Sequence, residues 1–532
     1  MKRKELKKVM AVVLAATMVM GTAACGDNGT SSGSGDTSGS GNQQSDTQQS
    51  SGGETGGSGS EAGDSGSETG DSGSEAGDSG EEDLGAYTVR RDADGNVYDL
   101  GGIDVIIRDW WSQETEPQNA MDEAREEYLD WAQETYNFTV KQTAISTWGD
   151  VPTDFVNYVT SGGDEYYLFV LRQGAELTAA MNNELMYDLS TLDCLDFSEE
   201  KWGSGVHEMY SKNGKIYGMR GEEPEPRGGL FFNKRLLEEA GIDYNDIYTW
   251  QENMEWTWDK FEELCEKIHE DTDNDGQIDR WAIMTFNSSF YNETVWSNNG
   301  DFIGMENGKY VNRLESDATL EALNWALRML DTYRRPDPED AAWDYCYTGF
   351  MNGEAAFLAD EAYNAGAYNP DDTSHKFCAM VDDFGFVCFP MGPKASDYTN
   401  IYTDNVFAIP ACYDADKAWK IAFVYDLYTE PTPGYEDESS MTNSYYSNFR
   451  DMESVDYTIS RMVKNGRVTY HTLIGNLDLG PDVIWGLSSE NTPAQQAESI
   501  RNTWAAYIAL ANGEITEEQM NEQLGIEEEA EE

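Results

Sequence analysis

The segment "IDVIIRDWW" (residues 103–111) is a run of branched apolar residues that ends in charged and aromatic ones, which predicts a buried β-strand. After it, "EPQNAMDEAREEYLDWAQETYN" (116–137) carries apolar residues at helical spacing, and "FTVKQTAI" (138–145) is again typical of a strand. The segment 165–189 adds another strand and another helix. Because strands that alternate with helices tend to pair in parallel, we predict an α/β fold built on a mainly parallel sheet.

The residues directly after these strands are candidates for ligand binding. In open α/β sheets, ligands bind in the crevice beyond the carboxyl ends of the strands. The residues that this rule selects are Asp109, Trp110, Trp111, Trp148, Arg172 and Gln173. An indole ring stacks on the apolar face of a sugar, while carboxylate, guanidinium and amide groups bond its hydroxyls. Packing in the core is the alternative for each tryptophan. Two adjacent ones point in different directions, however, so we expect Trp110 or Trp111 in the binding cleft.

The N-terminus has the layout of a secretory signal. Basic residues precede the apolar run 9–20, and small residues follow it up to Cys25. The apolar run is too short to span a membrane as a helix. Small residues directly before a cysteine resemble the lipobox of bacterial lipoproteins, although Thr22 departs from the usual leucine. This resemblance implies that residues 1–25 are a lipoprotein signal peptide and that Cys25 carries the lipid; an ordinary signal peptide with an incidental cysteine is the alternative.

Residues 26–83 consist almost entirely of Gly, Ser, Asp, Glu, Thr, Gln and Asn. Such a composition cannot bury a core and predicts a disordered linker. Acidic residues without basic ones make this segment repel itself, which favours an extended stalk between a lipid anchor and the domain that follows. Residues 84–532 remain, and they are numerous enough for two lobes in one chain.

Charge and cysteine content narrow the function classes further. The formal net charge is -65 at pH 7, which excludes nucleic acid as a partner. An even number of cysteines after Cys25 permits up to three disulfides in an exported protein, among Cys194, Cys265, Cys346, Cys378, Cys388 and Cys412. Cys265 falls on an apolar helical stripe and is expected to be a buried thiol. The sequence has no Cys-x-x-Cys pair, so zinc clusters and thioredoxin-like chemistry have no support.

The segment "DTDNDGQIDRWAI" (271–283) resembles a calcium-binding loop. Measured against the EF-hand pattern, the expected ligands are the carboxylates of Asp271, Asp273, Asp275 and Asp279 and the carbonyl of Gln277. Ala282 stands where the pattern has a bidentate glutamate, and a strand rather than a second helix follows. We therefore predict a structural Ca²⁺ ion that fastens a helix to a strand. An acidic turn without an ion is the alternative.

The strongest family resemblance surrounds this loop. "GGLFFNKRLLEEAGIDYND" (228–246) and "MEWTWDKFEELCEKIHEDTDNDGQIDRWAI" (254–283), followed by "NGEAAFL" (352–358), "FGFVCFPMGPK" (384–394) and "NVFAIPACYDADKAWKIAFVYDLY" (405–428), occur in one order. In that order they resemble the family 1 extracellular solute-binding proteins of bacterial ABC importers. The resemblance spans most of the chain after the linker.

This resemblance implies a two-lobed α/β fold of the periplasmic-binding-protein type, with a mainly parallel sheet in each lobe. The expected lobes are 84–220 with 360–430, and 221–359 with 431–532, and the expected hinges lie near 214–220 and 353–361. The implied function is capture of a carbohydrate, an oligosaccharide, in the cleft between the lobes. The monomeric, lipid-anchored protein then delivers it to the permease subunits of an ABC importer at the extracytoplasmic face of the cell membrane.

The family tends to place aromatic residues in three regions of the second lobe. The candidates that these regions supply here are Trp296, Glu361, Tyr363 and Trp485. Arg227, just before the strand in 228–233, is a further candidate. Its alternative role is to neutralise the glutamates that precede it.

Enzymatic functions have less support. The four histidines show no metal-binding spacing, and neither a Gly-x-Ser-x-Gly elbow in the ordered part nor a phosphate-binding loop occurs. We therefore expect a binding protein and not an enzyme. Paired carboxylates cannot be judged from spacing in a chain with 100 acidic residues, so a lipid-anchored glycoside hydrolase or a carbohydrate-surface adhesin is the alternative.

Overall fold

The computed structural model describes residues 87–526 apart from short gaps at 112–116, 118, 173, 203–204, 222–224, 367–376 and 402–404. The predicted signal peptide, Cys25 and the linker 26–83 lie outside the described residues. In the part that is described, no helix is long and apolar enough to cross a membrane.

The first sheet has four strands in the order β13-β3-β1-β2. Its strands are β1 (Ile103–Asp109), β2 (Phe138–Ala144), β3 (Tyr166–Leu171) and β13 (Val406–Ala408). The pairs β1–β2 and β1–β3 are parallel, with Ile103 opposite Phe138, whereas β13 runs antiparallel to β3. The two strands predicted at 103–111 and 138–145 are therefore present, and the sheet is mainly parallel as expected.

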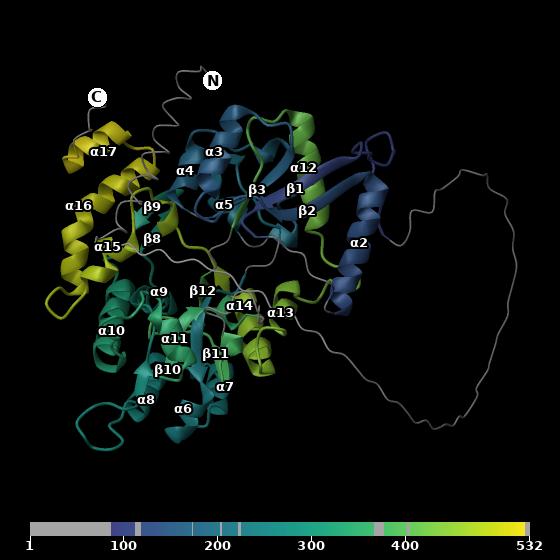
Figure 1. Cartoon of the computed structure of the whole chain (residues 1–532). Coiled ribbons are helices and arrows are strands. Elements are labelled where there is room, and N and C mark those ends of the chain that lie inside the picture. Colours follow the sequence, from purple (N-terminus) through teal and green to yellow (C-terminus); the bar gives the residue numbers. More distant parts are fainter. Residues whose placement is uncertain are drawn as a thin grey trace, which may run out of the picture. The chain divides into compact units, whose positions relative to one another are not determined.

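Helices cover both faces of this sheet because side chains alternate along its strands. Leu168 and Val170 of β3 pack with α2 (Ala120–Tyr136) and α12 (Ala415–Tyr428), and Phe169 and Leu171 pack on the opposite face. The helices of that opposite face are α3 (Val151–Ser161), α4 (Ala175–Asn182) and α5 (Val206–Met209). Figure 1 labels β1, β2 and β3 of this sheet, with α3, α4 and α12 nearby. Burial on both faces explains the continuous apolar runs of the sequence.

The predicted helix after β1 has clear end signals. The Asn119 side chain accepts hydrogen bonds from the N–H groups of Met121 and Asp122 at the start of α2. Asn137 adopts a left-handed conformation (φ 56°) and ends the helix. The chain can therefore reverse within one residue and enter β2.

The second sheet has the order β11-β6-β10-β7. Its strands are β6 (Gly228–Asn233), β7 (Trp281–Ile283), β10 (Ala355–Glu361) and β11 (Phe384–Val387). The helices that accompany it are α6 (Lys234–Glu239), α7 (Asn245–Glu252), α8 (Trp258–Ile268), α9 (Asn287–Ser297), α10 (Asp317–Tyr333) and α11 (Tyr345–Met351). Figure 1 shows β10 and β11 in this group with α6, α7 and α8 nearby.

The remaining elements are short strand pairs and the C-terminal helices. The strands are β4 (Ser211–Lys212), β5 (Lys215–Ile216), β8 (Ile303–Glu306), β9 (Lys309–Asn312), β12 (Asn400–Ile401) and β14 (Gly466–Arg467). The helices are α13 (Ser440–Tyr445), α14 (Ser460–Lys464), α15 (Leu479–Asp482), α16 (Pro493–Ala511) and α17 (Glu517–Leu524), together with the short helical turns η6 (His471–Leu473) and η7 (Ile484–Gly486). α16 contributes buried Trp504 to the core of the second sheet.

The predicted two-lobed α/β class is confirmed, but three details differ. The second sheet is not mainly parallel, because β6 runs antiparallel to both β10 and β11. The chain returns to the first sheet at β13, and not near residue 360, because β11 still pairs with β6. The segment 353–361, expected as a hinge, contains the interior strand β10, and the connections between the sheets fall at 217–227, 388–405 and 429–439.

Cysteine and helix predictions can also be compared with the structure. Cys265 is fully buried on the apolar face of α8, as predicted, and Thr257 caps that helix. Within the described residues, Cys194, Cys265, Cys346, Cys388 and Cys412 are all free thiols. Three disulfides are therefore not formed.

Candidate functional site

The carboxyl ends of β1, β2 and β3 meet at one edge of the first sheet, where the sequence placed its candidates. The N–H groups of Ile145 and Ser146, directly after β2, donate to the Asp109 carbonyl at the end of β1. Asp109 itself is 1% exposed, and its carboxylate accepts hydrogen bonds from the Trp110 N–H at 2.6 Å and from Gln142 Nε2 at 2.7 Å. Asp109 therefore holds this edge together from below the surface.

The two adjacent tryptophans are placed differently. Trp110 is half-buried and packs against the hydrophobic clusters on both faces of the first sheet. Trp111 is 45% exposed. Of the pair, only Trp111 offers a broad accessible ring surface at this edge.

Trp148 and Arg172 form a contact between the second and third strand ends. Trp148 is 60% exposed, and the Arg172 guanidinium lies over its ring at 4.6 Å from the centroid. Arg172 Nε also donates to the Trp148 carbonyl at 3.1 Å, and Arg172 Nη2 pairs with Glu176 Oε1 at 3.2 Å. Glu176 lies on the first turn of α4 and holds Arg172 in place. It was missed by sequence reasoning, because only the residues directly after strands were selected. Gln173, the remaining candidate, lies outside the described residues.

A second group of candidates lies at one edge of the second sheet. Because β6 and β10 are antiparallel, Gly228 at the start of β6 stands opposite Glu361 at the end of β10. Arg227, one residue earlier, pairs with Glu361 at 3.1 Å and with Glu225 at 2.9 Å. Arg227 therefore neutralises one of the glutamates before it and also joins the group formed by the other candidates.

Tyr363 stands just after Glu361 and is 40% exposed. Burial of its hydroxyl and the nearby Glu361 carboxylate raise the pKa of Tyr363 to about 12. The phenol is therefore protonated at neutral pH. An accessible ring with a hydroxyl donor at its end suits a ligand that has both apolar faces and polar edges.

The two second-lobe tryptophans differ sharply in exposure. Trp485, on η7, is 75% exposed, and η7 packs against α9. Trp296, on α9, is 7% exposed and lies in the core near the His471 ring, with its indole N–H lacking a hydrogen-bond partner in the described structure. The expectation of an accessible stacking ring at Trp296 is therefore wrong.

Two further residues at this edge were missed by sequence reasoning. Trp343 is 83% exposed and stacks on Phe286, which follows β7, with ring centroids 5.8 Å apart. It precedes α11 and no strand, so the strand-end rule could not select it. Glu293 is a buried carboxylic acid one turn before Trp296 on α9. Because Glu293 lies three residues before the candidate Trp296 on a helix, the sequence could have indicated that the two side chains share one helix face.

The acidic loop 271–279 brings three of its four carboxylates together. Ligand oxygens of Asp271, Asp273 and Asp279 lie within 4.8 Å of one another, while Asp275 is outside this group. Asp271 accepts from the Gly276 N–H at 2.8 Å, and Gly276 has φ 92°, which favours glycine. Exposed carboxylate oxygens arranged in this way fit a hard cation such as Ca²⁺.

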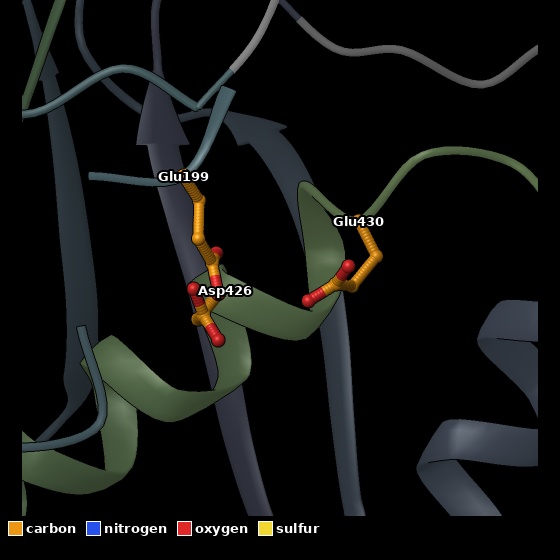
Figure 2. A group of neighbouring side chains, drawn as sticks. All are labelled: Glu199, Asp426 and Glu430. Carbon is orange, nitrogen blue, oxygen red and sulfur yellow. The ribbon is translucent and has the colours of Figure 1, made fainter. Parts of the chain in front are cut away.

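A second acidic cluster has a different character. Figure 2 shows the neighbouring carboxylates of Glu199, of Asp426 in the last turn of α12 and of Glu430, which lies two residues beyond that helix. Lys201 pairs with Asp426 at 2.8 Å and with Glu430 at 3.0 Å, and Arg90 also pairs with both. Lys201 also pairs with Glu199 at 3.3 Å, so two protein cations already contact all three carboxylates, and the cluster is an ion-pair network rather than a metal site.

Comparisons with known proteins show what this chain is similar to. Residues 210–424 match the family model of the bacterial extracellular solute-binding proteins. An arabinooligosaccharide-binding protein of Bacillus subtilis is 28% identical over 168 residues, which are 31% of this chain and 35% of the relative, so the match spans about a third of that protein's length.

Among solved structures, the GacH receptor of Streptomyces glaucescens, determined unliganded and in complex with acarbose, superposes with a TM-score of 0.50. It is 14% identical, and the match covers 76% of this chain and 98% of the receptor, which shows a shared fold. Residues 210–424 thus carry the sequence pattern of a bacterial extracellular solute-binding protein, and the family resemblance drawn from the sequence is confirmed.

Proposed function

We propose that this chain is the substrate-binding component of an ABC importer and that it captures an oligosaccharide. The observation that carries the proposal is the combination of accessible aromatic rings and charged groups at the strand ends of both sheets. Trp111 and Trp148 accompany Arg172 at the first edge, and Tyr363 stands beside the Arg227–Glu361 pair at the second. Rings can stack on sugar faces while the charged groups bond the hydroxyls between them.

The family and the matched relatives support this ligand class. The family model describes solute-binding proteins, and the curated relative is named for binding arabinooligosaccharides. In the proposed mechanism, the solute first contacts one lobe, and the closed form is favoured because only it contacts the ligand from both sides. The chain is a binding protein in this proposal and performs no chemistry on the solute.

The proposal includes an extracytoplasmic location and a lipid anchor. Extracellular solute-binding proteins act outside the cytoplasmic membrane, and Cys25 follows a signal with small residues before it. The acidic linker 26–83 would hold the monomeric binding domain away from the anchor, within reach of the permease. Metabolic labelling with a radioactive fatty acid tests the anchor: wild type should be labelled and Cys25→Ser should not.

We further propose that the loop 271–279 binds a structural Ca²⁺ ion. Asp271, Asp273 and Asp279 would supply carboxylate ligands and Gln277 its carbonyl. The ion would offset the repulsion between these carboxylates and connect α8 to β7. Asp275 is placed to accept the Gln277 N–H at 2.8 Å, which shapes the loop. Its carboxylate is therefore assigned a supporting role, in contrast to the ligand role expected from the sequence.

Isothermal titration of the purified chain with arabinotriose, maltotetraose and mannotriose tests the proposed function. We expect saturable binding of at least one saccharide and no release of reducing ends. Failure of all three to bind, or their hydrolysis by the purified chain, would contradict an oligosaccharide-capture function.

A further inference from the structure

Glu293 on α9 is buried at the second sheet edge without a partner. Its side chain is 6% exposed, and within the described residues it forms no hydrogen bond or ion pair. Its carboxyl oxygens are not fully enclosed, so they keep contact with a small accessible space. A carboxylate in this state is unfavourable, because the desolvated charge has no compensating donor.

The backbone at this edge makes room for the Glu293 carboxylate. α9 packs against β6 and β10, and a Cβ atom added at Gly228 would lie 1.7 Å from Glu293 Oε1. The absence of a side chain at Gly228 is therefore what admits the acid. Since Gly228 pairs with Glu361, Glu293 stands at the same edge as the Arg227–Glu361 pair.

The charged groups that face Glu293 favour its neutral form. Asp360 and Glu361 on β10 repel a negative charge, Arg467 on β14 attracts it, and Cys388 after β11 is also close. Burial, together with Glu361 and Asp360, raises the pKa of Glu293 to about 8. Arg227 is engaged by Glu225 and Glu361, and Arg467 pairs with Asp301 at 2.9 Å, so each cation near Glu293 already has an anion.

A donor close to Glu293 on the same helix also lacks an acceptor. The indole N–H of Trp296, three residues after Glu293 on α9, has no hydrogen-bond partner in the described structure, and its side chain is 7% exposed. Buried polar groups are rarely left unpaired, and a ligand hydroxyl can both accept from and donate to the Glu293 carboxyl group, which keeps some accessible surface, whereas the enclosed Trp296 N–H is out of a ligand's reach.

We propose that Glu293 is a ligand-binding residue that engages a sugar hydroxyl as a neutral carboxylic acid, both donating and accepting a hydrogen bond, and that its ionisation releases the sugar. This inference rests on the proposed oligosaccharide-binding function and adds a specificity group to its second sheet edge. Glu293 loses a proton to water when it ionises; the carboxylate can then no longer donate to the hydroxyl, and Asp360 and Glu361 oppose the new charge. Capture is therefore strong at neutral and mildly acidic pH and weakens under alkaline conditions.

Affinity measured against pH tests this inference on the purified chain. The titrant is whichever of arabinotriose, maltotetraose and mannotriose binds wild type most tightly at pH 6.5. The wild-type Kd should rise about tenfold between pH 6.5 and pH 9, because only the protonated fraction is competent. Glu293→Gln is neutral at every pH and keeps a donor and an acceptor, so its Kd should stay constant over that range. Exposed Glu498 supplies the matched control, and Glu498→Gln should reproduce the wild-type profile.

The melting temperature of the ligand-free chain supplies an independent readout. Between pH 6.5 and pH 9, wild type should lose stability relative to Glu293→Gln, because only wild type acquires a buried charge. If a saccharide binds but wild type and Glu293→Gln share one affinity profile, the role of Glu293 is refuted while the proposed function stands. If no saccharide binds wild type, the proposed function fails, and the ligand role of Glu293 fails with it. A wild-type affinity that increases with pH would also overturn the neutral-acid assignment.

Discussion

The two sheet edges hold buried acidic side chains in opposite hydrogen-bonding states, paired at the first edge and unpaired at the second. At the first edge, the buried carboxylate of Asp109 accepts two hydrogen bonds, and Arg172 is engaged by Trp148 and Glu176. At the second edge, Glu293 and the Trp296 indole N–H have no partner in the described structure. Asp109 and Arg172 at the first edge are therefore already paired within the protein, whereas Glu293 at the second edge leaves hydrogen bonds for a ligand to make. Exposed rings stand at both edges, Trp111 and Trp148 at the first and Tyr363 and Trp343 at the second, so we infer that both edges can stack on the solute and that Glu293 at the second edge binds its polar groups.

The largest expected effect concerns Trp296, the buried tryptophan on α9. Trp296→Ala should lower the free energy of unfolding by about 3–5 kcal/mol, because it removes a large core side chain and leaves a cavity. Trp485 is in the same lobe but 75% exposed, and Trp485→Ala should change stability by no more than about 0.5 kcal/mol. Denaturant unfolding of both variants provides the comparison. Equal losses would show that the two rings do not differ in packing.

The pH dependence of stability should reveal the two buried titratable groups. The pKa of Glu293 is raised to about 8, so its contribution is fully favourable below the usual glutamate value and is lost as pH rises toward 8. Burial lowers the pKa of His471 to about 4, so its contribution is present above about 6.5 and is lost as pH falls toward 4. Stability should therefore be highest near pH 5–7 and fall on both sides, by up to about 1.4 kcal/mol per pH unit for each group.

Unfolding measured from pH 4 to pH 9 checks both arms. Glu293→Gln should flatten only the alkaline arm, and His471→Asn only the acidic arm. A variant that flattens the opposite arm, or neither, would show that other groups control the profile.

The accessible rings should control affinity more than stability. Trp485→Ala and Trp111→Ala should each weaken saccharide binding by about 1–3 kcal/mol, the scale of a buried aromatic contact, with little change in melting temperature. Trp110→Ala is the matched control for Trp111→Ala, because Trp110 packs against both core clusters. That control should lower the melting temperature. Unchanged affinity in both Trp485→Ala and Trp111→Ala would remove the stacking role from these rings.

The smallest expected effect belongs to the acidic loop, which precedes β7 and supplies none of the candidate ligand-binding residues at either edge. Removing Ca²⁺ with a chelator should lower stability by about 1–2 kcal/mol through lost ligand linkage while leaving saccharide affinity nearly unchanged. Asp279→Asn should remove the response to chelator, and Asp275→Asn, outside the carboxylate group, should retain it. A tenfold change in saccharide affinity on chelation would couple the ion to the binding site and contradict a fastening role.

The sequence predicted the first sheet well because its central strands β1 and β3 carry runs of buried apolar residues and its helices have apolar residues at helical spacing. The hydrophobic pattern of 103–111 and the helical spacing of apolar residues in 116–137 were sufficient to predict β1 and α2. The second sheet was less predictable, because the antiparallel course of β6 depends on partners more than 120 residues away. Strand direction in such a sheet is a tertiary property that local periodicity does not contain.

The candidate site residues likewise differ in whether local sequence was enough to predict them. Trp148 and Arg172 were predictable because parallel strands bring their ends to one edge. Burial of Trp296 was not predictable, since a single tryptophan on a helix serves packing and binding equally well in sequence. Glu293 was missed because its significance arises from Gly228, Asp360 and Glu361, which meet it only in the folded chain.

Tryptophan fluorescence and calorimetric heat recorded in one titration test the central claim, capture of an oligosaccharide between aromatic rings, most directly. The purified chain is titrated with arabinotriose and maltotetraose, beside a variant that carries both Trp148→Ala and Trp485→Ala. The account predicts saturable heat and a change in tryptophan emission for wild type with at least one saccharide, and at least tenfold weaker binding by the variant. Undiminished binding by the variant, or the absence of binding by wild type, would contradict it.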